Sequence, residues 1–204
     1  MTLSRQDSGQ KNPIEEAIRT RRSARRFADR DIEPGVVERL IEAATWAPSA
    51  GNLQPWRFFA VRGEAWKTAL AEAALGQRFV AQAPVVVVVC AEPGRSATRY
   101  GERGRMLYCL QDTAAATQNL LLAAAALGIG SCWVGAFDEE AVSRALGLPP
   151  GFRPVAIIPL GYPADGAIGG VDPGSITPGF AAPASVAGGA RKRRPLAEVL
   201  QFLD

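Results

Sequence analysis

Apolar side chains near the start of the chain recur every three or four residues, which is the spacing of an amphipathic helix. A first helix is predicted to open with Pro13 behind an Asn12 cap, with Glu15 at the reciprocal capping-box position. A second is predicted to follow Pro34 and to end before Pro48. Their apolar stripes are Ile14, Ala17 and Ile18 in the first helix and Val37, Leu40, Ile41 and Ala44 in the second.

Further along the chain, segments with strand character alternate with helical ones. WRFFAV at 56–61 and the apolar segment at 153–161 predict two strands. VVVVV at 85–89 is a continuous β-branched run, which predicts a strand that is covered on both faces. An Ala-rich helix is predicted at 64–74, and a capped helix is predicted to start from Asp138.

The longest helical stretch, RMLYCLQDTAAATQNLLLAAAAL at 105–127, has little polar face and many small side chains. A helix of this kind must be buried nearly all round. In a chain of 204 residues, packing against a second copy is the simplest way to bury it. The pattern therefore predicts a homodimer built around this helix, with Gly128 as its C-terminal cap.

The C-terminal part of the chain has a different character. Residues 163–190 hold seven glycines and four prolines, too many for a regular element, so we expect a long extended loop. A short helix is predicted from Pro195. The length fits one domain, which we expect to span 1–204 with an N-terminal tail at 1–12 and a C-terminal arm at 191–204.

The composition is that of a globular protein, with 48% hydrophobic and 21% charged residues. Residues 1–12 contain no apolar segment of the kind found in signal peptides. The most apolar stretch, LLLAAAALGIG, is too short to cross a bilayer. We therefore expect a cytoplasmic protein that does not interact with membranes.

The chain contains no histidine and three cysteines, Cys90, Cys109 and Cys132. The cysteines are widely spaced in apolar surroundings, which favours reduced, packed thiols over a disulfide framework or a zinc site. The absence of histidine excludes Ser-His-Asp and Cys-His catalysis and every metal site that uses histidine. We expect no metal, and any chemistry must be carried by another group.

The net charge is only +3, but arginines are clustered. Six lie within RTRRSARRFADR at 19–30, and RKRR follows at 191–194. The planar fork of arginine matches phosphate oxygens, so the clusters indicate a bound phosphate unless they are solvated charged faces. No zinc-finger spacing, RNA-binding aromatic motif or helix-turn-helix is evident, so we do not expect a nucleic-acid partner.

The segment WAPSAGNLQPW at 46–56 places small polar residues between two tryptophans. One interpretation is a plain turn from helix to strand in which Asn52 caps backbone groups. The other is a ligand site, because a planar heterocycle needs apolar walls and a few placed polar groups.

Four motifs together resemble the nitroreductase-like FMN-dependent oxidoreductases. RTRRSARRF, APSAGNLQPW, QNLLLAAAALGIGSCWVG and RKRRPLAEVL occur in the order and spacing of that family, from about residue 13 to 162 and again at the C-terminal basic segment. The resemblance implies an α+β fold, with a mostly antiparallel central sheet wrapped by helices. It also implies an intertwined homodimer with two FMN molecules at the subunit interface, over which the C-terminal segment reaches the partner.

The resemblance also implies roles for particular residues. The loop Pro48, Ser49, Ala50, Asn52 and Gln54 would lie against the flavin of the other subunit, with Pro48 and Ser49 at the ring and the two amides bonding its edge or ribityl chain. With this family in view, we prefer the flavin interpretation of the segment to the plain turn.

The remaining implied contacts come from three other segments. Arg21, Arg22 and Ser23 would bind the phosphate and ribityl chain, Arg25 the pyrimidine edge, and Arg191 and Arg193 the phosphate again. Trp133 would stack near the ring, while the backbone of Val134, Gly135 and Ala136 would approach flavin N5. Gln77 and Arg78 are further candidates for flavin contact.

The implied activity is hydride transfer from NADH or NADPH through FMN to a small oxidised acceptor, with ping-pong kinetics. The acceptor classes are nitroaromatics, quinones, enones and free flavin. The alternative is a flavin-binding relative with other chemistry, namely dehalogenation, peptide oxidation or flavin breakdown. The segment AEPGRSATRYGERG at 91–104 is shorter than in many relatives, and Tyr100, Arg103 and Arg105 either line the access route or belong to a surface loop.

Overall fold

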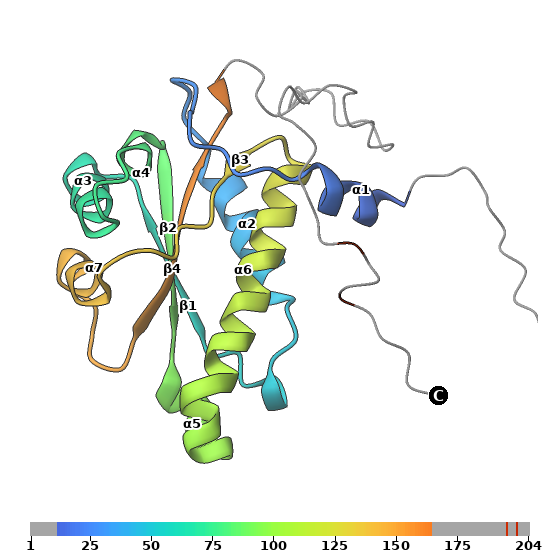
Figure 1. Ribbon diagram of the computed structural model, residues 1–204, viewed down its shortest axis with the longest axis vertical. Helices are drawn as coiled ribbons and strands as arrows, with labels where there is room; N and C mark the ends of the chain where they lie inside the picture. The colour runs from blue at the N-terminus through green and yellow to red at the C-terminus, as the bar shows by residue number, and fades with distance from the viewer. Residues whose placement is uncertain (1–11, 165–194, 196–198, 200–204) are drawn as a thin grey trace, which may run out of the picture.

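The computed structural model describes residues 12–164, Pro195 and Val199, and is built on a four-stranded antiparallel sheet of order β1-β2-β4-β3 (Figure 1). The strands are β1 (Trp56–Val61), β2 (Val85–Ala91), β3 (Gly130–Ser131) and β4 (Arg153–Gly161). At one end of the sheet Trp56 pairs with Ala91, and Ala91 with Arg153. At the other end Val85 and Ser131 both pair with Leu160. We call these the Trp56 end and the Ser131 end.

Both faces of the sheet are covered by helices, as the valine run predicts. Helices α2 (Pro34–Thr45) and α6 (Cys109–Ala126) lie on one face, and α3 (Glu64–Ala73), α4 (Phe79–Gln82) and α7 (Glu139–Leu146) on the other (Figure 1). Val85, Val87 and Val89 join the core beneath α2 and α6, while Val86 and Val88 join the core on the opposite face. Every residue of β2 is therefore buried.

Two predicted helix starts are confirmed by their caps. In α1 (Pro13–Thr20) the side chain of Asn12 accepts a hydrogen bond from the Ile14 N–H at 3.0 Å. Asp138 accepts bonds from the second and third N–H groups of α7, at 2.9 Å each. These side chains satisfy N–H groups that have no partner inside their helices.

The expectation of a surface loop before the long helix was wrong. Residues Pro93–Arg103 form α5, and a π-helical turn, Gly104–Tyr108, joins it to α6. Gly101 interrupts α5 with φ 54° and ψ −139°, a conformation that glycine adopts without penalty. The glycines and charges that suggest a loop thus lie within a kinked helix.

The expectation that α6 is buried mainly by a second copy also needs correction. Leu121 is 3% exposed and Ala124 is fully buried in the core that α6 shares with α2 and the sheet of its own protomer. The outward face of α6 carries the exposed Gln111 and Gln118, and the half-buried Leu122 lies on the same face, one turn beyond Gln118. A partner that packs on α6 would meet this outward face.

The three cysteines are free and buried, as the sequence predicts. Burial raises the pKa of Cys90 to about 12, and it also raises that of Cys109, so neither thiol ionises readily near neutral pH. Within residues 12–164, no helix combines the length and the apolar character needed to cross a bilayer.

The predicted loop at 163–190 and arm at 191–204 lie almost wholly outside the described residues. Two residues at the start of the loop are described. Pro163 forms an isolated bridge with Phe27, and the Ala164 N–H bonds the Arg26 carbonyl at 3.2 Å. The chain is therefore paired for two residues into the segment expected to be irregular.

Candidate functional site

The loop at 48–54 holds its polar side chains on an unusual backbone. Gly51, Asn52 and Gln54 have φ values of 58°, 54° and 50°. Asparagine tolerates this left-handed region, but for glutamine it is strained, and such strain concentrates at functional sites. The Gln54 N–H bonds the Ser49 hydroxyl at 3.0 Å, and its side-chain amide lies 3.3 Å from Asn52 Oδ1. The loop therefore presents two coupled, exposed amides.

A buried carboxylate in α6 holds this loop in place. The Ala50 N–H lies 3.1 Å from both carboxylate oxygens of Asp112, which is only 8% exposed. Burial raises the pKa of Asp112, and the bond from Ala50 opposes that rise. Asp112 is not among the site residues predicted from the sequence, although it is the one charged residue between Arg105 and Gly128. A charge within a buried helix is the signal that marks it.

Two substitutions of Asp112 distinguish the contribution of its hydrogen bond from that of its charge. Leucine leaves the part-buried Ala50 N–H without its acceptor, so we expect Asp112→Leu to lose about 1–3 kcal/mol of unfolding free energy. Asparagine keeps an oxygen acceptor, so Asp112→Asn should match or exceed the wild type near pH 7. The measurement is urea unfolding of the three proteins.

The pH dependence gives an independent check on this residue. The folded pKa lies above the ordinary value of 3.8, so ionisation destabilises the fold as pH rises through that interval. The wild type should lose this part of its stability between the two pKa values, and Asp112→Asn should not. Equal urea midpoints for the leucine and asparagine variants would refute the role of the Ala50 bond.

Helix α5 covers the same loop from one side. Arg95 Nε donates to the Leu53 carbonyl. A Cβ placed on Gly51 would lie 2.7 Å from the Tyr100 hydroxyl and 2.9 Å from Arg99 Nη1, so a larger residue there would displace the ends of these two side chains. The candidate ring-binding loop is thus held between α5 and Asp112 of α6.

The arginine segment lies at the Ser131 end of the sheet. Ser23 forms a parallel bridge with Ser131, and the Ala24 N–H bonds the Ser131 carbonyl at 2.9 Å. Arg22 Nη1 caps the end of α1 by bonding the carbonyls of Thr20 and Arg21 at 3.1 Å each. Ser23 is exposed, and the half-buried Arg21 follows the last residue of α1.

Two further predicted segments lie beside the arginines. The Arg25 guanidinium lies 5.7 Å from the ring centroid of Phe79, the residue that follows Arg78. The Gln77 amide donates to the Ala136 carbonyl at 3.3 Å. These contacts join the arginine segment to the segment 77–79, and that segment to 133–136.

The strand that carries Trp133 limits which backbone groups can meet a ligand. The N–H and carbonyl of Val134 are both paired with Ile157 at 3.0 Å. Trp133 is half-buried, whereas Gly135 and Ala136 are exposed and make no backbone N–H bond within the described residues. Among the three predicted backbone positions, Gly135 and Ala136 are the accessible ones.

The predicted site residues therefore form two groups in one chain. Pro48, Ser49, Ala50, Asn52 and Gln54 lie just before Trp56, at one end of the sheet, whereas Arg21, Arg22, Ser23 and Arg25 lie at the Ser131 end. Figure 1 shows this separation, with the cyan loop low and the blue segment at the top. Arg191 and Arg193 lie outside the described residues. One protomer does not bring the two groups together.

The donor set fits a flavin mononucleotide. Its phosphate end needs cationic donors, which Arg21 and Arg22 would supply, and its ring needs amide donors and acceptors, which Asn52 and Gln54 would supply. The carboxylate of Asp112 accepts the hydrogen bond from the Ala50 N–H. No group of three or more His, Cys, Asp or Glu residues within the described part of the chain is placed to hold a metal ion.

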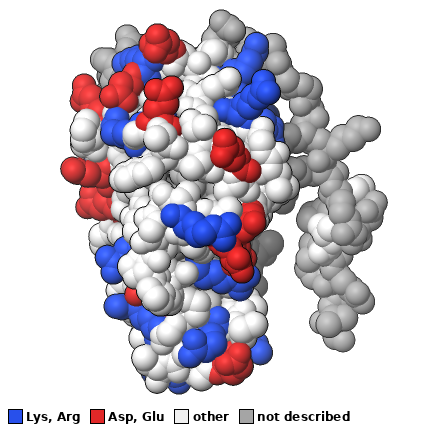
Figure 2. Space-filling view, turned by 90° about the vertical axis from the view of Figure 1, so that its left-hand side faces the viewer, with Lys and Arg blue, Asp and Glu red and all other residues white. Residues whose placement is uncertain are grey.

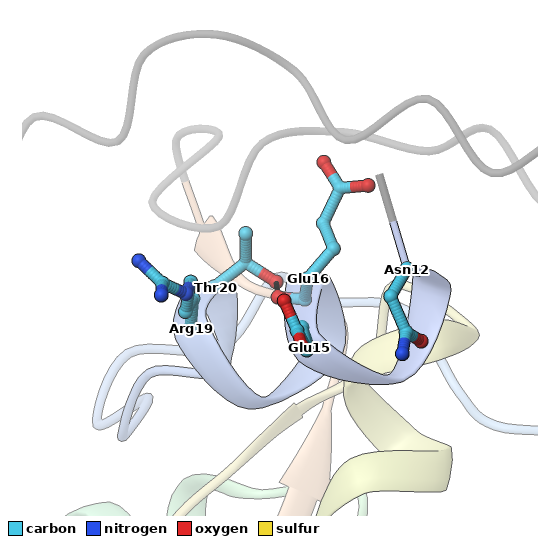
Figure 3. Close-up of a pocket in the computed structure, with 5 residues that line it drawn as sticks. All are labelled: Asn12, Glu15, Glu16, Arg19 and Thr20. Carbon is cyan, nitrogen blue, oxygen red and sulfur yellow. Dashed lines mark hydrogen bonds between the residues drawn. The ribbon is translucent and has the colours of Figure 1, made fainter. Parts of the chain in front are cut away.

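A hollow lies on α1, whose last residue, Thr20, directly precedes Arg21. Its described lining is Asn12, Glu15, Glu16, Arg19 and Thr20, all from one helix (Figure 3). The Thr20 hydroxyl bonds the Glu16 carbonyl at 2.7 Å, and no residue of α1 is buried. This exposed lining lacks the apolar walls of a ligand site.

Comparison with known proteins agrees with the motifs and the fold. The sequence profile of the Nitroreductase family matches residues 18–78 and 67–162. A protein of Archaeoglobus fulgidus, whose name joins NADH dehydrogenase and NAD(P)H nitroreductase, is 40% identical over 152 residues, 72% of this chain and 84% of the relative. A 5,6-dimethylbenzimidazole synthase of Rhodobacter capsulatus is 31% identical over 175 residues, 75% of this chain and 84% of the relative.

Solved structures show the same fold. A nitroreductase family protein of Streptococcus pneumoniae superposes with a TM-score of 0.73 at 25% identity, over 93% of this chain and 99% of that one. The α+β architecture with an antiparallel sheet is the one expected from the sequence. With a profile match across the sheet and its helices and a 40% identical relative, the chain belongs to the Nitroreductase family.

Proposed function

We propose that the protein is an FMN-dependent oxidoreductase that uses NADH or NADPH to reduce a small oxidised acceptor. The observation that carries the proposal is the rigid, strained loop at 48–54, which presents two amides from a backbone fixed by Asp112. The name of the Archaeoglobus fulgidus relative supports a nicotinamide donor. Nitroaromatics, quinones, enones and free flavin are the acceptor classes.

FMN, when bound, accepts a hydride from the nicotinamide and passes it to the acceptor. The protein residues bind and orient it. Arg21 and Arg22, joined by Arg191 and Arg193, hold the phosphate through charged hydrogen bonds. Arg25 stabilises negative charge at the pyrimidine edge, and Asn52 and Gln54 fix the plane of the ring. None of these roles needs a histidine.

The functional unit in this proposal is a homodimer, because the two groups of site residues lie at opposite ends of one protomer. Exposed apolar side chains support it. Ile14 and Ile18, four residues apart on α1, are 65% and 53% exposed, and Trp46, just before the loop, is 82% exposed. Large apolar side chains exposed in this way are typical of a surface that another chain covers.

Other flavin chemistry is the second candidate, favoured by the relative named as a 5,6-dimethylbenzimidazole synthase. Anaerobic mixing with NADH or NADPH separates the two. Bleaching of the flavin band, followed by recovery with an acceptor, supports the oxidoreductase. A flavin that neither donor reduces would refute it and favour the second candidate.

The purified protein should be yellow and should carry non-covalent FMN rather than FAD. The arginine clusters suit one terminal phosphate. Heat or acid should release the flavin, and chromatography of the supernatant against FMN and FAD standards identifies it. Colourless protein that takes up no added FMN would end the proposal.

A further inference from the structure

Helix α5 carries three arginines one turn apart, at 95, 99 and 103, beside the loop at 48–54. Arg95 bonds the Leu53 carbonyl and the Arg99 guanidinium lies against Gly51, so the arginines border the loop directly. Figure 2, viewed from the side of α3 and α7, shows Lys and Arg gathered at the lower end of the molecule, where Figure 1 places α5.

The charges of these three arginines are not neutralised by carboxylates of the described chain. Arg95 bonds a carbonyl, Arg99 lies 5.6 Å from the Tyr100 ring centroid, and Arg103 Nε donates to the Tyr108 hydroxyl at 2.8 Å.

Neighbouring arginines are paired with acids instead. Arg57 lies 3.5 Å from Glu92 and Arg105 lies 3.6 Å from Glu102. Among the described residues, the positive charge of the arginines at 95, 99 and 103 is therefore not offset by a paired carboxylate.

Two tyrosine rings stand among these cations. Tyr100 and Tyr108 pack edge to face, with centroids 5.2 Å apart and planes at 82°. The Arg103 guanidinium lies 5.2 Å from the Tyr108 centroid as well as bonding its hydroxyl. These contacts orient Arg103 before a ligand arrives, and they leave its two terminal nitrogens for other acceptors.

We propose that Arg99 and Arg103 bind an anionic group, a carboxylate or a phosphate, on the substrate that reacts over the loop at 48–54. The inference rests on the proposed function, since that loop is the candidate wall of the flavin site. Two sources share this chemistry, the 2′-phosphate of NADPH and an acid group on the acceptor. The tyrosine rings border the aromatic part of the same molecule.

The test compares the wild type with an Arg99→Gln, Arg103→Gln double variant. Arg144→Gln is the matched control, because Arg144 is an exposed arginine on α7, paired with Glu140 at 3.5 Å. One kinetic arm compares NADPH with NADH at a fixed acceptor. A second compares 4-nitrobenzoate with neutral 4-nitrobenzamide at a fixed donor. Calorimetric titration with benzoate and benzamide, which are not reduced, measures binding apart from turnover.

The double variant should lose about tenfold or more in kcat/KM for one charged substrate and much less for its neutral counterpart, which is the scale of a charged hydrogen bond. Loss with NADPH alone assigns the phosphate, and loss with 4-nitrobenzoate alone, accompanied by weaker benzoate binding, assigns the acceptor. The Arg144 variant should behave as the wild type does. Equal changes for charged and neutral partners would overturn the inference.

The same measurements separate a failure of the anion site from a failure of the proposed function. Wild-type protein that oxidises neither nicotinamide but binds benzoate through Arg99 and Arg103 would refute the proposed function and retain the anion site. Protein that turns over normally, with no preference for charged substrates in any arm, would refute the anion site and retain the proposed function.

Discussion

Replacing Leu121 by Glu should prevent the protomer from folding, whereas the same change at Leu122 should leave it folded and separate the two copies. Leu121 is 3% exposed within the core between α6 and the sheet. Loss of its apolar contacts alone costs about 2–5 kcal/mol, and an unpaired buried carboxylate adds to this. The sum approaches the whole stability of a typical domain, about 5–15 kcal/mol.

Leu122 points about 100° around α6 from Leu121, toward the outward face that carries the exposed Gln118. A carboxylate there is solvated in an isolated protomer, but it is unpaired when two copies of the face meet across a two-fold axis. Circular dichroism should show native helix for Leu122→Glu and its loss for Leu121→Glu. Sedimentation should give a monomer without FMN for Leu122→Glu. A Leu122→Glu dimer that keeps its flavin would place the interface elsewhere.

The elements that the sequence predicted well are those with local signals. Strand 56–61 matches β1, and 153–161 matches β4. Asn12 and Asp138 mark helix starts because their side chains bond N–H groups two or three residues later, within the same turn. Such contacts depend on neighbouring residues alone.

The errors arise where distant contacts decide the structure. Helix α5 contains Gly94 and Gly101, and it packs on the loop at 48–54 through the bond of Arg95 to the Leu53 carbonyl. That pairing joins segments more than forty residues apart, and no local pattern encodes it. The apolar character of 105–127 shows that the helix is buried but does not show which surface buries it.

The same distinction between local signals and distant contacts applies to the candidate site. Its residues were predicted from motifs, and their contacts with a ligand stay a prediction. The fixed backbone of the loop was not predicted, because it depends on Asp112, sixty-two residues from Ala50. Gln54 adopts a positive φ that propensity alone disfavours, and its N–H bonds the Ser49 hydroxyl, five residues away.

Two defective variants should restore one good site when they are combined in a dimer. The first is Arg21→Ala with Arg25→Ala, at the Ser131 end of the sheet. The second is Asn52→Gly with Gln54→Gly, just before Trp56, where glycine keeps the positive φ and removes the amide. Each should bind FMN roughly tenfold to a hundredfold more weakly than the wild type, because each loses two hydrogen-bonding side chains.

The two variants are coexpressed with different affinity tags, and the mixed dimer is isolated by successive purification on both. If each site takes its arginines from one chain and its loop from the other, the mixed dimer holds one wild-type site and one doubly defective site. Fluorescence titration should then give one tight FMN per dimer. A site contained in a single chain gives two singly defective sites and no tight binding. That second result would require the loop and the arginine segment to approach one another within a protomer, against their separation by the length of the sheet.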